Sequence, residues 1–284
     1  MLQRLEDADS NVRWKVVHAL GKIGSAEAIP GLLQRLQHAD SDVRWIAVLG
    51  LGNIGSEGIP GLLQGLDDAD FNVRISAVEA LGNIGSEGIP GLLQGLDDAD
   101  SNVRFSAVEA LGTIGSEGIP GLLQGLNDAD YTVRSKASQA LSEIGSAEAI
   151  PGLLQLQLHA DSDVRCIAVE VLCGISSVDA VPGLLKGMEE TNSYLRGQVA
   201  EALGVIGTAD AVPGLLQGLE DADSYVRSKA VDALRKIAKR NPDYLALHQP
   251  YLLALISTDS GTEAHEIILT IQASCKYYNY SYLD

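Results

Sequence analysis

The side chains with the clearest chemical potential are an aspartate and an arginine that recur four residues apart along most of the chain. The arginines follow one another every 30 or 31 residues, so their guanidinium groups could form a ladder that binds anions. In the structural alternative, each Asp caps a helix and each Arg reaches a carboxylate in its own or the next layer. The periodicity favours this second interpretation, because a repeat must carry its own inter-layer contact. The pairs are Asp9/Arg13, Asp40/Arg44, Asp70/Arg74, Asp100/Arg104, Asp130/Arg134, Asp161/Arg165 and Asp223/Arg227, with Asn192 before Arg196.

Other groups that could do chemistry lack the context that chemistry needs. The sequence GLGNIG at residues 50–55 matches a dinucleotide-binding fingerprint, but that motif needs a preceding strand. Cys166 and Cys173 lie seven residues apart on a predicted helix, about 10 Å along its axis, whereas disulfide-bonded Cα atoms lie about 4.4–6.8 Å apart. Cys275 falls on an apolar face and is expected to be a buried small residue.

The histidines are scattered and form no pair with metal-ligand spacing. Two of them, His38 and His159, occupy a turn position that Asp takes in other repeats. We therefore expect no catalytic residue, no metal site and no cofactor. The histidines are His18, His38, His159, His248 and His265.

The composition excludes several classes of partner. The 284 residues carry a formal net charge of -18, which opposes binding to a nucleic-acid backbone or to an anionic membrane surface. The chain begins without an apolar signal region and contains no run of about 18 apolar residues. Its few, unpaired cysteines fit a reducing compartment. We expect a soluble cytoplasmic protein.

The sequence is organised around residues 51–110, which consist of two 30-residue blocks that differ at only two positions. The differences are Phe71 against Ser101 and Ile75 against Phe105. More diverged copies extend from Asp9 to about Ala238. Self-similarity at this period predicts a stacked repeat protein, in which each unit buries its apolar face against its neighbours.

Each block is predicted to contain two helices. The first should run from about Ser56, its N-cap, to Asp67, with Pro60 either beginning its regular part or bending its first turn. The second should begin after an Asp70 cap and end near Gly85. Apolar residues recur at helical spacing in both, and no segment shows strand alternation, so the fold class is all-α.

The repeat pattern defines a predicted array over residues 1–240, followed by a helical cap and a Tyr-rich tail over residues 241–284. The array holds about seven and a half repeats, because the first begins inside what should be a first helix. We infer a truncated chain or the C-terminal part of a longer one. The cap is predicted to contain helices over about residues 244–256 and 262–276.

The segment from Asp70 to Leu81 carries the pattern D-x-x-V-R-x-x-A-x-x-A-L. With its copies, it resembles HEAT repeats of the short type found in phycobilisome lyases, over about five-sixths of the chain. The resemblance implies a right-handed α-α superhelix with the second helices along its concave wall. Residues 243–280 also resemble the closing segment of bacterial NACHT-type signalling NTPases, with His265 and Cys275 matching its Cys/His pair.

The residue directly after each repeated Arg points away from the apolar stripe of its helix and is expected to face solvent. In four successive repeats this residue is large and apolar, and layers about 10 Å apart would align the four into a strip roughly 30 Å long. Such a strip is typical of an interface. Alternatively, each side chain lies flat over the neighbouring layer. We call these residues the apolar strip: Trp14, Trp45, Ile75 and Phe105.

The position five residues after the Arg faces the same side and becomes acidic along the chain: His18, Leu49, Glu79 and Glu109. If the second helices line the concave wall, a basic or amphipathic protein segment is the complementary ligand. The alternative is an ordinary solvated face.

These features predict a non-catalytic scaffold that binds another protein along its second helices, as the sensor region of a larger signalling protein. An alternative from the lyase resemblance is a subunit of a phycobilin lyase or a bilin chaperone, with a bilin or phycobiliprotein as partner. A third class, recognition of alkylated bases by HEAT-like solenoids, is opposed by the negative charge.

Overall fold

The computed structural model describes residues 26–246, together with residues 7, 9, 12, 15, 16, 19, 248, 250, 252, 253, 265 and 267–269. Its secondary structure consists of helices and turns, with no strand among these residues. The chain divides into two compact units between Ile144 and Gly145. The predicted incomplete first repeat and most of the predicted C-terminal cap lie outside the described residues.

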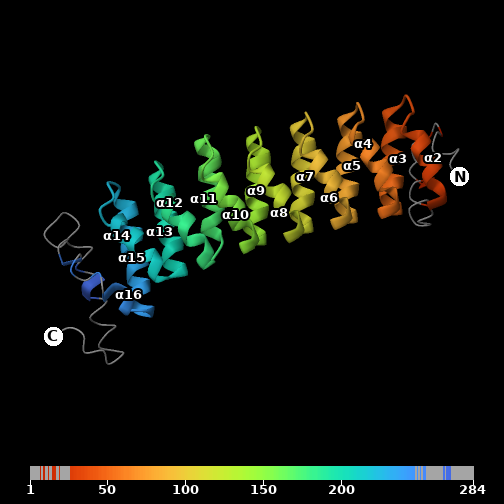
Figure 1. The fold of residues 1–284 in the computed structure, drawn as a ribbon. Helices are drawn as coiled ribbons and strands as arrows, with labels where there is room; N and C mark the ends of the chain where they lie inside the picture. The colour runs from red at the N-terminus through yellow and green to blue at the C-terminus, as the bar shows by residue number, and fades with distance from the viewer. Residues whose placement is uncertain are drawn as a thin grey trace. The chain divides into compact units, whose positions relative to one another are not determined.

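In the first unit, each repeat consists of a 3-10 turn, a short first helix and a longer second helix (Figure 1). The first helices are α2 (Ile29–Arg35), α4 (Ile59–Leu66), α6 (Ile89–Gly95) and α8 (Ile119–Gly125). The second helices are α3 (Ser41–Ile54), α5 (Phe71–Ile84), α7 (Ser101–Ile114) and α9 (Tyr131–Ile144). The turns are η2 (Ala26–Ala28), η3 (Ser56–Gly58), η4 (Ser86–Gly88) and η5 (Ser116–Gly118).

The second unit repeats this order. Its first helices are α10 (Ile150–Leu156), α12 (Val181–Gly187) and α14 (Val212–Gly218), and its second helices are α11 (Ser162–Gly174), α13 (Ser193–Ile206) and α15 (Ser224–Arg240). The turns η6 (Ala147–Ala149), η7 (Val178–Ala180) and η8 (Ala209–Ala211) precede the first helices, and α16 (Asp243–Ala246) follows α15. About seven two-helix units therefore make up the all-α fold.

The second helices begin and end as the sequence predicts. The carboxylate of Asp70 accepts a hydrogen bond of 2.8 Å from the backbone N–H of Asn72, so Asp70 is the N-cap of α5. Gly85 follows the helix with φ 90°, a conformation that only glycine adopts without strain. The same cap and glycine flank α3 and α7.

The first helices begin differently from the prediction. Ser56 does not cap α4: it starts the turn η3, and the α-helix begins at Ile59 after a residue with no capping side chain. Pro60 lies in the first turn of α4, where its missing N–H costs no intrahelical hydrogen bond. In two repeats whose turn is one residue longer, Ser146 and Ser177 accept a hydrogen bond that caps the 3-10 turn, and the α-helix after it again begins without a capping side chain. The prediction of a Ser cap is therefore wrong for the short turn.

The second helices of consecutive repeats pack side by side within each unit, and small residues allow the close approach. A Cβ atom on Gly82 of α5 would lie 2.6 Å from the Cβ of Ala110 on α7, so a larger residue would push the helices apart. Val73, Ala77 and Leu81 of α5 are buried, with Ala77 next to Gly65 of α4 and Leu81 next to Gly91 of α6. The core is thus a continuous apolar layer between helices within each unit.

The repeated Arg joins two repeats through paired hydrogen bonds. The guanidinium of Arg74 donates from Nε to Asp98 Oδ2 at 2.7 Å and from Nη2 to Asp98 Oδ1 at 3.1 Å. Its Nη1 donates to the backbone carbonyl of Asp68, in the turn before its own helix, at 2.9 Å. Arg74 therefore fixes its own inter-helix turn and holds the equivalent turn of the next repeat. Arg44 with Asp68 and Arg104 with Asp128 repeat this geometry.

The second unit uses the same contact with more variation. Arg196 donates to Asp221 at 2.7 Å, but Arg165 faces the longer Glu190 with 3.4 Å between Nε and Oε1. Asp161 caps α11, four residues before its Arg. In neither unit does a described Arg donate to the carboxylate four residues before it. The Asp caps its own helix, and the Arg partner is a different carboxylate of the following repeat.

The last Arg of the first unit keeps only part of this arrangement. Arg134 Nη1 donates to the carbonyl of Asp128 at 2.7 Å, and Asp130 accepts from the backbone N–H of Thr132 at 2.7 Å. The Nε of Arg134 is buried without a hydrogen bond in the described part of the chain.

We predict that Asp98→Asn destabilises the first unit, because an amide cannot accept both guanidinium hydrogen bonds. Hydrogen bonds to charged groups contribute about 1.5–3 kcal/mol, so the free energy of unfolding should fall by about that amount. The matched control is Asp97→Asn, because Asp97 is the exposed neighbour of Asp98. Urea unfolding of the two variants measures the difference, and equal values for them would contradict the role of Asp98.

The acid stability of the protein should depend on these carboxylates. The hydrogen bond from Arg196 lowers the pKa of Asp221, so this group stabilises the fold fully above its unfolded pKa of about 3.9 and less as the pH falls through its folded pKa. Asp221→Asn should therefore lower stability at neutral pH and make its decline below about pH 5 shallower. Urea titrations at several pH values test this, and a decline of unchanged steepness would argue against it.

Candidate partner-binding surface

The predicted partner-binding residues that the structure describes lie on three second helices of the first unit. Trp45 and Leu49 lie on α3, Ile75 and Glu79 on α5, and Phe105 and Glu109 on α7. Trp14 and His18 lie outside the described residues. We call the side of α3, α5, α7 and α9 that carries these residues the second-helix face.

The described residues of the apolar strip are neither fully exposed to solvent nor fully covered by the neighbouring layer. Trp45, Ile75 and Phe105 are each half-buried. The indole N–H of Trp45 on α3 donates a hydrogen bond of 2.6 Å to the hydroxyl of Ser76 on α5. Trp45 thus leans onto the next repeat and still leaves part of its ring accessible.

Phe105 contacts the next repeat in a related way. The ammonium of Lys136 on α9 lies 5.6 Å from the centroid of the Phe105 ring and 2.7 Å from Glu109 Oε1. Lys136 occupies the same repeat position as Ser76, two residues after the Arg. The residue at that position therefore contacts the apolar strip of the preceding repeat, either as a short hydroxyl or as a long ammonium.

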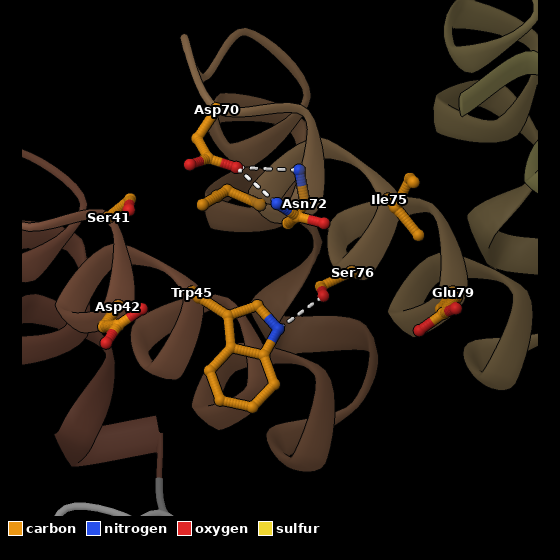
Figure 2. A pocket seen from close by; sticks show the side chains of 9 residues that line it. Ser41, Asp42, Trp45, Asp70, Asn72, Ile75, Ser76 and Glu79 are labelled. Atoms are coloured by element: carbon orange, nitrogen blue, oxygen red, sulfur yellow. Dashed lines mark hydrogen bonds between the residues drawn. The ribbon is translucent and has the colours of Figure 1, made fainter. Parts of the chain in front are cut away.

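A hollow of about 340 Å³ opens between α3 and α5 beside Trp45. Figure 2 shows the indole reaching from α3 toward Ser76 of α5, with Ile75 and Glu79 on the far side of Ser76 from the ring. Asp42 lies on the α3 side of the hollow. Asp70 caps α5 by accepting a hydrogen bond from the backbone N–H of Asn72. The hollow therefore combines an aromatic ring with carboxylates. Its lining residues are Ser41, Asp42, Trp45, Asp70, Asn72, Val73, Ile75, Ser76 and Glu79.

A second hollow of about 270 Å³ lies between α5 and α7. Glu79 belongs to both hollows, and Ser106 and Glu109 line the second one from α7. Glu79 and Glu109 are exposed, whereas Leu49 at the equivalent position of α3 is half-buried. The second-helix face thus carries apolar groups with carboxylates beside them.

The residues two after each Arg also contribute to the second-helix face, although they were not predicted to do so. Along the first unit this position holds Ile46, Ser76, Ser106 and Lys136. Its variation from apolar to hydroxyl to ammonium was visible in the sequence. The contact of this residue with the apolar strip of the preceding repeat could not be seen in the sequence, because it depends on how neighbouring helices are rotated against each other.

Two cysteines, Cys166 and Cys173, lie among the described residues, both on α11. Burial raises the pKa of Cys173 to about 12, so its thiol stays protonated and unreactive at neutral pH. Burial also raises the pKa of Cys166, and both thiols are free. Within the described residues, no three His, Cys, Asp or Glu side chains are grouped so that they could hold a metal ion. Cys275 lies outside that part of the chain.

No helix among the described residues is both long enough and apolar enough to span a membrane.

The family model described as HEAT repeats matches the chain in seven overlapping segments: residues 1–58, 29–89, 59–120, 89–165, 119–191, 150–235 and 181–262. No curated protein shows significant similarity to the chain. Among solved structures, an engineered protein is 24% identical, with a TM-score of 0.46, over 97% of this chain and 90% of that one. The Escherichia coli protein YibA is 20% identical, with a TM-score of 0.44, over 82% of this chain and 90% of that one.

The contact between Phe105 and Lys136 gives a prediction about stability. A double-mutant cycle with Phe105→Leu and Lys136→Met should show a favourable coupling of about 0.5–1 kcal/mol, the range for a cation–π contact at an exposed site. Thermal or urea unfolding of the four proteins provides the measurement. The control cycle pairs Phe105→Leu with the substitution Lys229→Met in the second unit and should show no coupling. Equal couplings in both cycles would argue against the contact.

Proposed function

The chain belongs to the HEAT-repeat family, whose repeats generally mediate protein interactions, and we propose that it is a non-catalytic scaffold that binds another protein along the second-helix face. The observation that carries this proposal is the half-exposed state of Trp45, Ile75 and Phe105, of which Trp45 and Ile75 line an open hollow. Accessible aromatic groups are typical of residues that dominate protein–protein affinity.

The chemistry of the face indicates the kind of segment that it binds. Glu79 and Glu109 border the apolar groups, and the whole chain carries a net charge of -18. A basic or amphipathic segment of a partner offers positive charge to these carboxylates and apolar side chains to Trp45 and Phe105. In this role the repeats act as the sensor region of a larger signalling protein.

The absence of catalysis is part of the proposal. It is supported by the raised pKa values of Cys166 and Cys173, which keep both thiols protonated. The alternative role, as a subunit of a phycobilin lyase or a bilin chaperone, makes a different prediction. Titration of the protein with a bilin should then shift the absorbance of the chromophore, whereas a protein-binding scaffold should leave it unchanged.

A pull-down with a triple variant tests the scaffold proposal. Trp45→Ser, Ile75→Ser and Phe105→Ser together should reduce recovery of bound partners by about tenfold or more, because loss of one strong aromatic anchor costs about 2 kcal/mol or more. The matched control is Gln64→Ala, Gln94→Ala and Gln124→Ala, which changes exposed residues of the first helices. Circular dichroism checks that both variants fold.

Recovery of the same partners, in unchanged amounts, with the triple serine variant would overturn the proposed surface. Loss of recovery with the glutamine variant alone would instead place the binding surface on the first helices.

A further inference from the structure

The chain twice places one of its own lysine ammonium groups between an aromatic ring and a carboxylate. In the first unit, Lys136 lies 2.7 Å from Glu109 and 5.6 Å from the ring centroid of Phe105. In the second unit, Lys229 lies 2.6 Å from Glu201 and 5.6 Å from the ring centroid of Tyr225. Each of these lysines is the second residue after a repeated Arg. The repeat geometry therefore forms a site for an ammonium group.

In the second unit, the aromatic ring of this site comes from a different repeat position than in the first unit. The residue after Arg196 is Gly197, and a Cβ atom on it would clash with the ring of Tyr225. The ring thus occupies the space that the Phe105 side chain takes in the first unit. Glu201 lies five residues after its Arg, as Glu109 does. Two different sequences therefore produce the same ring, carboxylate and ammonium arrangement.

Between α5 and α7 no lysine occupies the equivalent position, and the position of the ring holds Ile75. The residue equivalent to Lys136 is Ser106, whose side chain is too short to reach across, and the residue equivalent to Glu109 is Glu79. The hollow of about 270 Å³ lies at this place and is lined by Ser106, Glu79 and Glu109. No side chain of the described residues forms an ion pair with Glu79.

Between α3 and α5 the equivalent residue is Ser76, which accepts the hydrogen bond from Trp45. The larger hollow here is lined by the Trp45 ring, Asp42 and Glu79. Trp provides the strongest cation–π attraction of the aromatic side chains. The α3 position equivalent to Glu109 holds Leu49, so the negative charge beside this hollow comes from other carboxylates, including Glu79 on α5.

We propose that the two hollows each bind one lysine side chain of a partner segment, against the Trp45 ring in the first hollow and beside Glu79 in the second, at the repeat position that Lys136 occupies between α7 and α9. This inference rests on the proposed function and names the chemistry of the partner at the same surface. Helix layers are about 10 Å apart, and two lysines seven residues apart on a helix are separated by about 10.5 Å along its axis. The occupant is therefore an amphipathic helix with two lysines seven residues apart on one face.

The test uses a fluorescently labelled synthetic helix of this design, with fluorescence anisotropy as the readout for the full chain. A peptide of identical composition, with its two lysines on opposite faces, is the control for charge alone. The designed peptide should bind about tenfold more tightly or better, because only it reaches both hollows and a factor of ten corresponds to 1.4 kcal/mol. Equal affinities for both peptides would overturn the proposal.

Two substitutions move the affinity in opposite directions. S106K supplies an internal ammonium to Glu79 and should weaken binding of the designed peptide by about tenfold. Its control, Q94K, adds the same charge on the exposed surface of α6 and should change affinity much less. K136S opens a third hollow and should strengthen binding of a longer peptide with a third lysine at the same spacing.

E79Q keeps the experiment decisive if S106K does not fold, because Glu79 is exposed and its amide analogue should leave the fold intact. E79Q should weaken binding of the designed peptide and have little effect on binding of the control peptide.

The experiments distinguish failure of the lysine proposal from failure of the proposed function. If the designed peptide does not discriminate, but the triple serine variant still loses its protein partners, the second-helix face binds proteins through other chemistry.

Discussion

The paired hydrogen bonds between an arginine of one repeat and an aspartate of the next are the interaction on which the rest of the structure depends. Arg74 holds two carbonyl groups of its own turn, at Asp68 and Ala69, and both oxygens of Asp98. A planar guanidinium can satisfy this set of acceptors only when the two turns have one relative position. The contact therefore fixes the register between consecutive repeats as well as stabilising them. Both side chains of this pair are mostly buried, with side-chain exposures of 16% for Arg74 and 11% for Asp98.

A fixed register has a direct consequence for the second-helix face. Equivalent residues of consecutive second helices become neighbours, so Ser76 contacts Trp45 and Lys136 contacts Phe105, the residue one after the preceding Arg. Whether a hollow exists then depends on one side chain. Ser76 and Ser106 leave space beside the strip, and Lys136 fills it with an ammonium held by Glu109. The same backbone can thus offer an open or an occupied site in successive repeats.

Much of the local structure could be predicted from the sequence, because it depends on interactions within one helix or one turn. The repeat period, the Asp70 cap and the glycine after α5 follow from helix chemistry alone. The short turn before α4 was predicted incorrectly, since GSEGIP forms a 3-10 turn without a Ser cap whereas the longer GSAEAIP allows one at Ser146. In the short turn, a Cβ on Gly58 would clash with the carbonyl of Leu51, so the missing residue tightens the backbone and glycine becomes necessary.

The contacts between repeats were harder to predict, because helical periodicity gives the direction of a side chain but not the element that it meets. The carboxylates that bind the arginines, Asp68, Asp98 and Asp128, recur at one repeat position, yet His38 and His159 also occupy that position and the nearer Asp at the cap position seemed an equal candidate by spacing. The half-burial of Trp45 has the same origin, since its partner Ser76 lies 31 residues away. Predictions for Trp14 and His18 concern residues outside the described part of the chain.

The most direct test of this account is a double-mutant cycle between Arg74→Met and Asp98→Asn, with the free energy of unfolding measured in urea. If the guanidinium and carboxylate hold two repeats in register, the coupling energy should be about 1.5–3 kcal/mol, and the double variant should be little less stable than either single one. A coupling near zero, with additive losses, would contradict it: the two side chains would then act independently, and the alignment of residues along the second-helix face would need another cause.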